Sequence, residues 1–311
     1  MTAPLLSVVL LGYQKFERTS GPCLESLRPW LSDPEVQVLA IDNGSPDGSG
    51  ERMRRWCERH SSITFMQSAS NRGFAGGMNW GAEHTGGQWL LLVNSDTEFA
   101  PHALDALKMV LRRVPDKVAM IGPVTNAAGN GQRLWKPEAD REEWLRIGEG
   151  LHANPSGHLM PAYRCDFFCI AIRADVWRQL GGLDTAFGLG YYEDFDFSLR
   201  MRAAGWEQAI TEDVFVFHQG SASFQASKEA RALMKRNKKL LQAKHPEARF
   251  EHTRVGNLAV MLAYQSLKSN GHWSPPFEMR WALRVGALEG DAPRRWWKLW
   301  AWRRRTAGIQ Y

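Results

Sequence analysis

The sequence contains no run of about eighteen uncharged apolar residues, the minimum for a helix that crosses a bilayer. Its N-terminus, MTAPLLSVVLLGYQKF, has neither the basic start nor the small-residue cleavage site of a secretory signal. The four cysteines (Cys23, Cys57, Cys165 and Cys169) form no CxxC pair and are too scattered for a disulfide framework. We therefore expect a cytoplasmic protein with reduced, mostly buried thiols.

Two phosphate-binding signatures are also missing. The chain has no GxGxxG fingerprint and no GxxxxGKS or GxxxxGKT loop, which argues against NAD-dependent enzymes and P-loop nucleotide hydrolases. The segment GYQKFERTS after the first apolar run is a poor fit to the Gly-rich, basic loop of nucleotidyltransferases. No recognised nucleic-acid-binding motif is present, so we expect no nucleic-acid partner.

The composition is that of an ordinary globular protein. Hydrophobic residues make up 44% and charged residues 23% of the 311 residues, which excludes a mostly disordered chain. The net charge of +6 suits anionic partners. Much of this excess lies in the segment 294–305, RRWWKLWAWRRR, so the rest of the chain is closer to neutral.

Short apolar runs alternate with amphipathic stretches through the first half, a pattern typical of a mostly parallel sheet covered by helices. Later apolar runs from Cys165 (CDFFCIAI) and Val214 (VFVFH) predict two added strands, with a helix from about Glu193 to Ala204 between them. The Gly-, Asn- and Pro-rich stretch 127–162 predicts a long loop with one short helix. Strands are predicted at Leu6–Leu11, Val36–Ile41, Ile63–Gln67, Trp89–Val93 and Val118–Ile121, and further helices at Lys228–Lys244 and Arg254–Lys268.

Polar side chains follow the ends of the predicted strands. Tyr13 follows the first strand, Asp42 and Asn43 the second, and the segments 71–77 and 94–96 the third and fourth. In open α/β sheets, ligands bind beyond the carboxyl ends of the strands. We therefore expect one crevice to collect all four groups.

The segment NSD at the end of the fourth strand predicts a metal site. Asn94 and Asp96 are two residues apart, so both side chains can point into the crevice. A carboxylate there suits Mg²⁺ or Mn²⁺, which prefer oxygen ligands and complete their shells with water and substrate phosphates. The alternative is a turn or helix cap, because the segment precedes Pro101 and a helix.

The segment NRGFAGGMNWG follows the third strand. Its glycines allow close approach of the backbone to a ligand, and the free N–H groups of the next helix would point outward. The segment predicts a diphosphate cradle, with an ordinary Gly-rich turn as the alternative.

Three carboxylates, Glu193, Asp194 and Asp196, open a helix in the segment GGLDTAFGLGYYEDFDFSLRMRAAGW. Acids at a helix N-terminus are stabilised by the macrodipole, so simple capping is one interpretation. The functional interpretation is a general base that takes a proton from an attacking hydroxyl. Gly188 and Gly190, just before it, would leave room for a substrate.

His218 ends the apolar run VFVFH and precedes the small polar residues QGSAS. A lone histidine at a strand end is more often structural. It can also complete a metal shell begun by Asp96.

Taken in order, VVLLGY, IDNGSPDGS, NRGFAGGMNWG, LLLVNSDTEF, the EDFDFSLR block and FHQGSAS resemble the large inverting family 2 of glycosyltransferases. The resemblance covers about Leu6 to Phe224, and the EDFDFSLR block with its downstream histidine is the most specific part. It implies the GT-A fold, an α/β architecture with a mostly parallel, Rossmann-like central sheet flanked by helices. It also implies single displacement with inversion, in a catalytic domain over 1–225. Residues 226–311 would form a C-terminal helical extension with a basic, Trp-rich tail.

On the donor side the resemblance implies contacts to metal, diphosphate and nucleoside. Asn94, Ser95 and Asp96 match the family's DxD motif, in a variant that leaves Asp96 as the one direct carboxylate ligand of Mg²⁺ or Mn²⁺. His218 matches a histidine that ligates the metal or touches the diphosphate. The remaining donor contacts are expected from Tyr13 and Asp42, at the base and ribose, and from Asn71 and Gly73.

On the acceptor side, Asp194 matches the usual catalytic base of the family, and Glu193 supports it. Trp135, Tyr192 and Asp196 are expected to contact the acceptor. Transfer builds negative charge on the departing diphosphate, which a divalent cation neutralises without a proton donor. Asp194 would meanwhile remove the acceptor's proton on the opposite face of the sugar.

The segment TNAAGNGQRLW resembles an acceptor-side loop of bacterial enzymes that build surface polysaccharides, rhamnosyltransferases among them. This resemblance favours dTDP-rhamnose as the donor, with a UDP-sugar as the alternative, and a saccharide or lipid-linked saccharide as the acceptor. A protein acceptor, or a relative that binds nucleotide sugar without catalysis, are the other interpretations. The intact acidic pair of Glu193 and Asp194 argues against a relative that binds nucleotide sugar without catalysis.

The tail 294–305 interleaves Trp with Arg and Lys. This pattern suits a membrane interface, because indoles favour the headgroup region and cations favour anionic lipid. We expect peripheral attachment to the inner face of the cell membrane. The alternative is a helix that packs its Trp side chains on the catalytic domain and leaves its basic residues in water.

Overall fold

The computed structural model describes residues 3–220, 228–250 and 253–290, so the predicted basic tail lies outside the described residues. The strands are β1 (Leu6–Gly12), β2 (Val36–Asp42), β3 (Ile63–Gln67), β4 (Trp89–Asn94), β5 (Thr97–Phe99), β6 (Val118–Val124), β7 (Leu159–Pro161), β8 (Cys169–Arg173) and β9 (Glu207–His218). The α-helices are α1 (Ser20–Leu27), α2 (Ser49–Glu58), α3 (Gly73–Ala82), α4 (Ala103–Leu111), α5 (Arg141–Ala153), α6 (Ala174–Leu180), α7 (Glu193–Ala203), α9 (Lys228–Lys244), α10 (Thr253–Ser269) and α11 (Pro275–Gly290).

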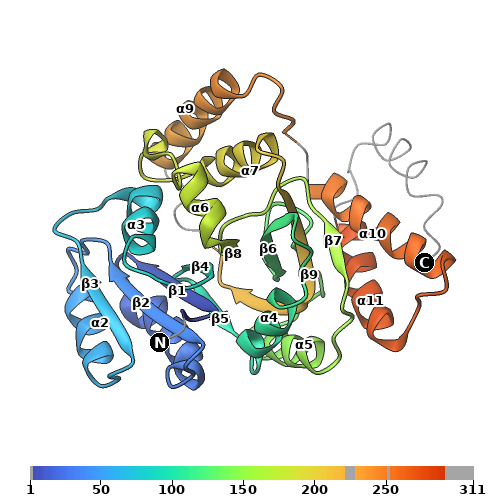
Figure 1. Ribbon diagram of the computed structural model, residues 1–311, viewed down its shortest axis with the longest axis horizontal. Helices are drawn as coiled ribbons and strands as arrows, with labels where there is room; N and C mark the ends of the chain where they lie inside the picture. Colours follow the sequence, from blue (N-terminus) through green and yellow to red (C-terminus); the bar gives the residue numbers. More distant parts are fainter. Residues whose placement is uncertain (1–2, 221–227, 251–252, 291–311) are drawn as a thin grey trace.

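Within the described chain these strands form one curled sheet in the order β3-β2-β1-β4-β8-β6-β9-β5, with β7 beside β9 (Figure 1). The four strands β3, β2, β1 and β4 are parallel. β8 then runs antiparallel between β4 and β6. β1 pairs with β2 on one side and with β4 on the other. The connections after neighbouring strands therefore leave the carboxyl edge of the sheet in opposite directions, which opens a crevice there.

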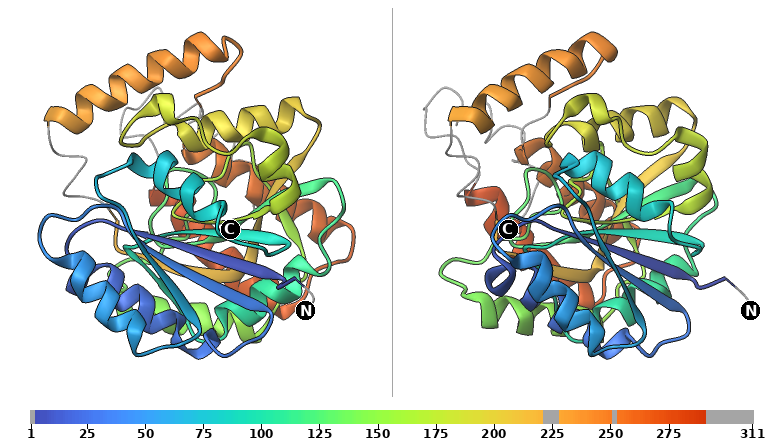
Figure 2. Two further views of the ribbon diagram at one scale, coloured as in Figure 1. Left: turned by 60° about the vertical axis from the view of Figure 1, so that its left-hand side comes forward. Right: turned by 90° about the vertical axis from the view of Figure 1, so that its left-hand side faces the viewer.

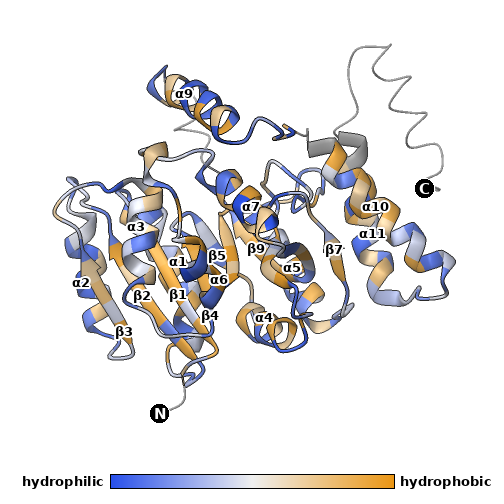
Figure 3. Ribbon diagram, turned by 45° about the horizontal axis from the view of Figure 1, so that its top comes forward, coloured by the Kyte–Doolittle hydropathy of each residue, from blue (hydrophilic) through white to orange (hydrophobic). Residues whose placement is uncertain are grey.

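Helices cover both faces of the sheet because its strands are apolar on both sides. β1 and β4 are almost entirely buried, as expected for parallel strands between two helical layers. Helices α1, α2 and α4 pack with one face of these strands. The other face shares a cluster with α3, α6 and α7. Figure 2 shows helices on both sides of the sheet, and the strands in Figure 3 are mostly apolar.

The C-terminal helices α10 and α11 join the core through strand β9. The register of β9 against β6 shifts between Thr211 and Phe215, which leaves a bulge that carries Glu212 and Asp213. Arg284 of α11 pairs with Glu212, and Arg280 pairs with Asp213 at 2.8 Å. All four side chains are at most 3% exposed, and removal of one partner from such a pair costs about 3–5 kcal/mol.

Most predicted elements are present. The first four strands and α9 lie where the sequence indicated, and the stretch 127–162 contains α5 and the short strand β7. Strand β9 begins at Glu207 rather than Val214, and helix α11 was not predicted. No helix among the described residues has the length and apolar character to cross a bilayer. The division of the chain at residue 225 stays a prediction, although Tyr264 and Phe277 belong to the same apolar cluster as the sheet.

Candidate active site

A cleft of about 1010 Å³ opens beyond the carboxyl end of β4. Its walls come from β4, the end of β9, the loops 126–129, 164–168 and 189–192, the start of α7, and α9. Of the predicted site residues, Asn94, Tyr192, Glu193, Asp194 and His218 line this cleft. The volume is that of a typical small-molecule site.

Asp42, predicted at the nucleotide, is fully buried at the end of β2. Its carboxylate accepts hydrogen bonds from the Ser45 backbone N–H at 3.1 Å, the Ser45 hydroxyl, and the Gln67 amide at 3.3 Å. Asp42 therefore shapes the turn after β2, and it does not line the cleft. Tyr13 lies at the end of β1 on the open surface, 42% exposed.

Asn71 and Gly73 fix the loop that precedes α3. Asn71 Oδ1 accepts from Asn43 Nδ2 at 3.1 Å and from the Gly73 N–H at 2.8 Å. Gly73 has φ +71°, and a Cβ there would meet the Gly188 carbonyl oxygen at 2.2 Å, so only glycine fits. The predicted donor loop is thus packed against the segment that leads to the predicted base.

Asp96 and His218, the predicted metal ligands, face each other. His218 Nε2 lies 3.3 Å from Asp96 Oδ2, and His218 Nδ1 lies 2.8 Å from the Ala127 carbonyl oxygen. Because a carbonyl oxygen can only accept a hydrogen bond, His218 Nδ1 carries the hydrogen. His218 Nε2, the other ring nitrogen, faces the Asp96 carboxylate. Burial alone lowers the pKa of His218, but the hydrogen bond to Asp96 and its negative charge outweigh burial, so the pKa lies above its ordinary value.

This pair fits a divalent cation. A carboxylate oxygen and an imidazole nitrogen are suitable ligands, and the second nitrogen of His218 is already fixed by a backbone carbonyl. Among the described residues, no three His, Cys, Asp or Glu side chains gather at one point. The protein would therefore supply two ligands, and phosphate oxygens and water the others. Ser95 lies between the strand and Asp96, outside the cleft wall.

The two predicted catalytic acids, Glu193 and Asp194, open helix α7 after a strained segment. Tyr191 and Tyr192 both adopt left-handed backbone conformations, with φ 72° and 75°. Such conformations are costly for residues other than glycine and persist only where the surrounding structure enforces them. The strain directs Glu193 and Asp194 from the start of the helix into the cleft.

Both carboxyls of the pair hold protons more tightly than ordinary acids. Burial and the neighbouring charge of Asp194 raise the pKa of Glu193 to about 8. Its Oε2 has no hydrogen-bond partner in the described part of the chain. Burial and the charge of Asp166 raise the pKa of Asp194 to about 6, against the opposing effect of Arg164. Because the two adjacent carboxyls titrate as a pair, the cleft carries less negative charge at neutral pH than two ordinary acids would supply.

Arg164 and Asp166 line the cleft beside Asp194, and the sequence interpretation missed both. Their side chains form an ion pair with an N–O distance of 2.5 Å, and the Gly129 N–H donates to Asp166 at 2.6 Å. The available signal was an Arg and an Asp on either side of Cys165, directly before an apolar run. Charged residues at that point lie at the mouth of the crevice.

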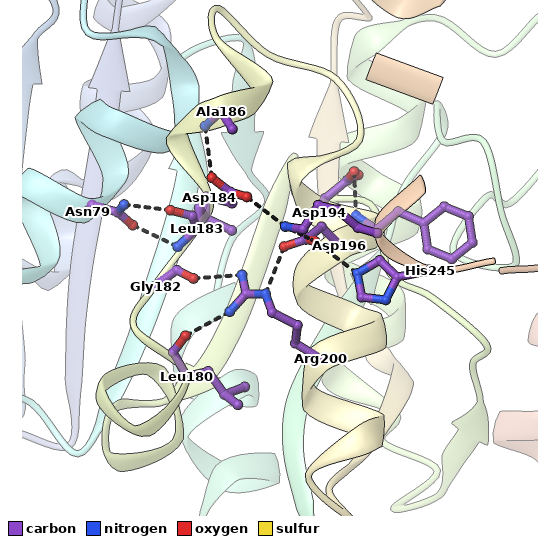
Figure 4. A network of polar contacts seen from close by, with 12 residues as sticks. Asn79, Leu180, Gly182, Leu183, Asp184, Ala186, Asp194, Asp196, Arg200 and His245 are labelled. Atoms are coloured by element: carbon purple, nitrogen blue, oxygen red, sulfur yellow. Dashed lines mark hydrogen bonds and ion pairs between the residues drawn. The ribbon is translucent and has the colours of Figure 1, made fainter. Parts of the chain in front are cut away.

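Asp196, predicted at the acceptor, instead lies in a buried polar network (Figure 4). Arg200 Nε lies at 2.7 Å, Lys244 Nζ at 2.6 Å and His245 Nε2 at 2.9 Å from its carboxylate. Burial raises its pKa, but these three hydrogen bonds outweigh burial and lower it. Helical geometry explains this correction. Residues two positions apart on a helix are separated by about 200°, so Asp196 faces away from Asp194.

Asn237 of α9 holds the loop before the base, and the sequence interpretation missed it as well. The side chain is fully buried. Its amide donates to the backbone carbonyls of Phe187 at 2.7 Å, Gly190 at 2.8 Å and Tyr191 at 3.1 Å. The available signal was one amide on the apolar face of a basic helix, in line with Ala230 and Leu241.

Trp135, the remaining residue predicted at the acceptor, does not line the cleft. Its backbone N–H donates to the Leu283 carbonyl at 3.3 Å, and its ring packs at Gly286 of α11. Arg133 lies over the same ring. Trp135 therefore joins the loop 125–135 to the C-terminal helices.

Comparison with known proteins agrees with this geometry. The family model "Glycosyl transferase family 2" matches residues 7–178. The chain is 24% identical, over 249 residues, to an N-acetylglucosaminyl-diphospho-decaprenol L-rhamnosyltransferase of Mycobacterium tuberculosis; the match covers 70% of this chain and 77% of that protein.

Solved structures with the same fold include a mannosyltransferase from Pyrobaculum calidifontis in complex with GDP-Man and Mn²⁺. Its TM-score is 0.53 at 17% identity, over 98% of this chain and 75% of that one. GalNAc-T7 with UDP, GalNAc and Mn²⁺ has a TM-score of 0.57 at 16% identity, over 79% and 51% of the two chains. The predicted GT-A fold is thereby confirmed.

Proposed function

The chain belongs to glycosyl transferase family 2, and from this premise we propose that it transfers a sugar, with inversion, from a nucleotide-diphosphate donor to a saccharide or lipid-linked saccharide. The observation that carries the proposal is that one cleft holds the Asp194 carboxyl group and the His218 imidazole that pairs with Asp96. One group suits proton removal from the acceptor, and the pair suits the diphosphate side.

The cleft supports a division of labour between the two carboxyls of α7. Asp194, with a pKa of about 6, is ionised at neutral pH and can accept the proton of an attacking hydroxyl. Glu193, with a pKa of about 8, keeps its proton and adds no second negative charge beside the base. The ion pair with Asp166 holds the Arg164 guanidinium on the same wall.

On the donor side, Asp96 and His218 would hold Mg²⁺ or Mn²⁺. The cation would neutralise the charge that builds on the departing diphosphate. The register of the parallel strands brings Gly12 opposite Asp42 and Leu11 opposite Asn94. The nucleotide would therefore extend from Asn94 across the ends of β1 and β2, where Tyr13 is exposed.

The relative from Mycobacterium tuberculosis is named for L-rhamnose and a lipid-linked diphospho-sugar. This name supports dTDP-rhamnose as the donor to test first and a lipid-linked saccharide as the acceptor, in the synthesis of cell-surface polysaccharide. A UDP-sugar donor and a protein acceptor are the alternatives. We also infer a cytoplasmic location, with the segment 294–305 at the inner face of the membrane.

A thermal-shift panel of UDP, GDP and dTDP, each with Mn²⁺, Mg²⁺ or EDTA, tests the donor site. Binding to the folded state alone raises its melting temperature, so the correct nucleotide should stabilise the protein only with metal. A response to no nucleotide would contradict the proposal. A transfer assay with the matching sugar nucleotide then separates an enzyme from a relative that only binds donor.

A further inference from the structure

Helix α9 has two faces of different character. Its inner face buries Ala230, Asn237 and Leu241 against the loop that precedes the base. The helix lies at the outer edge of the molecule, above α7 in Figure 1. Its outer face carries five exposed basic side chains, which we call the basic stripe: Lys228, Arg231, Lys235, Lys238 and Lys239.

Helical geometry places these five charges in one row. At 100° per residue they fall within an arc of about 100°, and at 1.5 Å per residue the row is roughly 17 Å long. Lys228 and Arg231 are three positions apart, and Arg231 and Lys235 are four. Like charges at these spacings destabilise a helix, so the row is unfavourable unless an anion compensates it.

The described part of the protein supplies no such anion. Across residues 3–220, 228–250 and 253–290, no stripe residue forms an ion pair with a carboxylate. The one acid of α9, Glu229, lies about a third of a turn away from the stripe. By contrast, Lys244 on the inner side of the same helix pairs with both Asp184 and Asp196 at 2.6 Å. Within the described ranges, α9 is therefore neutralised on its inner side and charged on its outer side.

The stripe borders the mouth of the cleft. Lys238 and Met234 of α9 line the cleft, and so does Leu189 on the loop that Asn237 holds. Leu189 is 55% exposed. A row of cations beside an exposed apolar side chain is the pattern of surfaces that rest on anionic membranes. Phe250, which lines the cleft, lies under the Lys238 ammonium group at 4.6 Å. Helix α9 itself contains no aromatic side chain on which nucleic-acid bases could stack.

We propose that the basic stripe of α9 binds the anionic head groups of a lipid bilayer and turns the mouth of the cleft toward the membrane. The proposal rests on the proposed function in one respect, namely that a lipid-linked acceptor is reached at that surface. It concerns a different part of the chain from the Trp-rich segment 294–305.

Binding of the full chain to vesicles, with and without anionic phosphatidylglycerol, tests the stripe. The variant combines Lys228→Gln, Arg231→Gln, Lys235→Gln and Lys239→Gln and leaves Lys238, which lines the cleft, in place. Each basic residue near an anionic surface contributes to partitioning, so we expect a loss of about 100-fold or more on anionic vesicles. The control removes the same charge elsewhere, through Arg59→Gln, Arg113→Gln, Lys117→Gln and Arg146→Gln, and should lose less than about 5-fold. Equal losses in the two variants would overturn the proposal.

A local probe then tells which surface touches the bilayer. The four natural cysteines are all buried, so a fluorophore can be attached selectively to Gln242→Cys, an exposed position in line with the stripe. A control probe at Glu149→Cys lies on α5, on the side of the molecule away from α9 (Figure 1). A nitroxide attached to lipid should quench the probe at residue 242 and leave the probe at residue 149 bright.

The outcomes separate this proposal from the proposed function. The stripe variant should keep the nucleotide- and metal-dependent thermal shift of the parent, because its four positions do not line the cleft. Absence of that shift in the parent would count against the donor site and leave the vesicle results intact. Absence of quenching at residue 242 on bound vesicles would overturn the stripe. So would a variant that loses binding to an oligonucleotide but not to vesicles, since the stripe would then be a nucleic-acid surface.

Discussion

The two halves of the cleft are positioned in different ways. On the donor side, neighbours in the sheet or in the sequence position the polar groups. Asp42 bonds to Ser45, and Asn94 continues a parallel strand. Asp96 meets His218 where β5 pairs with β9. On the acceptor side, distant side chains hold the base-bearing segment. Asn237 is 50 positions from Phe187, and His245 is 49 from Asp196. A change far from the chemistry should therefore disturb the acceptor side while the donor side still binds.

Asp194→Asn should produce the largest loss of activity. It should also separate the two halves of the cleft most clearly, because it affects catalysis and leaves donor binding in place. An amide cannot accept the proton, and loss of a general base costs about 10²–10⁴-fold. We expect kcat to fall by about 10³-fold, with the nucleotide-induced thermal shift nearly unchanged. The control is Asp184→Asn, which removes an acid of the same segment outside the cleft. Full activity in Asp194→Asn would remove this residue from the base role.

Asp96→Ala tests the donor half of the cleft. It removes the one carboxylate of the pair with His218, so metal-dependent donor binding should weaken by at least about 10- to 100-fold, the range for the loss of a residue that only supports a metal ligand. Thermal shifts of the correct nucleotide with Mn²⁺ and with EDTA measure this loss. Asp116→Ala, an exposed acid before β6, is the matched control. An unchanged response to metal would exclude Asp96 as a ligand.

Asn237→Ala tests whether the acceptor half depends on α9. Without its amide, three carbonyls before the base lose their common donor, and misplaced catalytic groups are costly. We expect kcat to fall by about 10-fold at an unchanged KM for the donor. Asn237→Asp should not restore activity, because a carboxylate cannot donate.

The matched control for Asn237 is Asn257→Ala. Asn257 is an equally buried asparagine that accepts a hydrogen bond from Arg284 and does not touch the base-bearing segment. This variant should lose stability but keep the kcat of its folded fraction. Equal kcat losses in the two variants would show that Asn237 acts through general stability alone.

The pH profile should show the smallest effect. The pKa of Asp194 is raised to about 6, and the ionised form is the active one. kcat/KM should therefore rise with pH through about 6 and fall about 10-fold for each unit below it, rather than below the ordinary value near 4. Rates at saturating metal measure this profile. A rise centred near pH 4 would mean that the base is not buried as described.

The sequence predicted the strands of the donor half better than the long-range contacts of the acceptor half for a physical reason. The strands β1 and β4 are nearly continuous apolar runs, and the polar residues at their ends follow directly in the chain. Such local patterns can be recognised in the sequence without knowledge of the fold. The helix α9 was also predicted with its bounds, because its apolar and basic residues alternate with helical period.

The remaining features depend on contacts that no local pattern encodes. Asp196 belongs to the same acidic motif as Asp194, yet the helix turns it toward Lys244 and His245, which come almost fifty residues later. Arg280 appears in an apolar segment and would ordinarily be expected at a surface. It is buried only because the bulge in β9 supplies Asp213. Sequence motifs therefore pointed to Glu193, Asp194, Asp96 and His218 but not to the residues that hold them.

The bulge in β9 also bears on how the chain matures during synthesis. Glu212 and Asp213 emerge from the ribosome 72 and 67 residues before Arg284 and Arg280, their partners. At about 5–20 residues per second, the two carboxylates wait roughly 3–15 s for their arginines. Until then β9 cannot bury them without a large cost. The catalytic sheet should therefore close only late in translation, when α11 has left the exit tunnel.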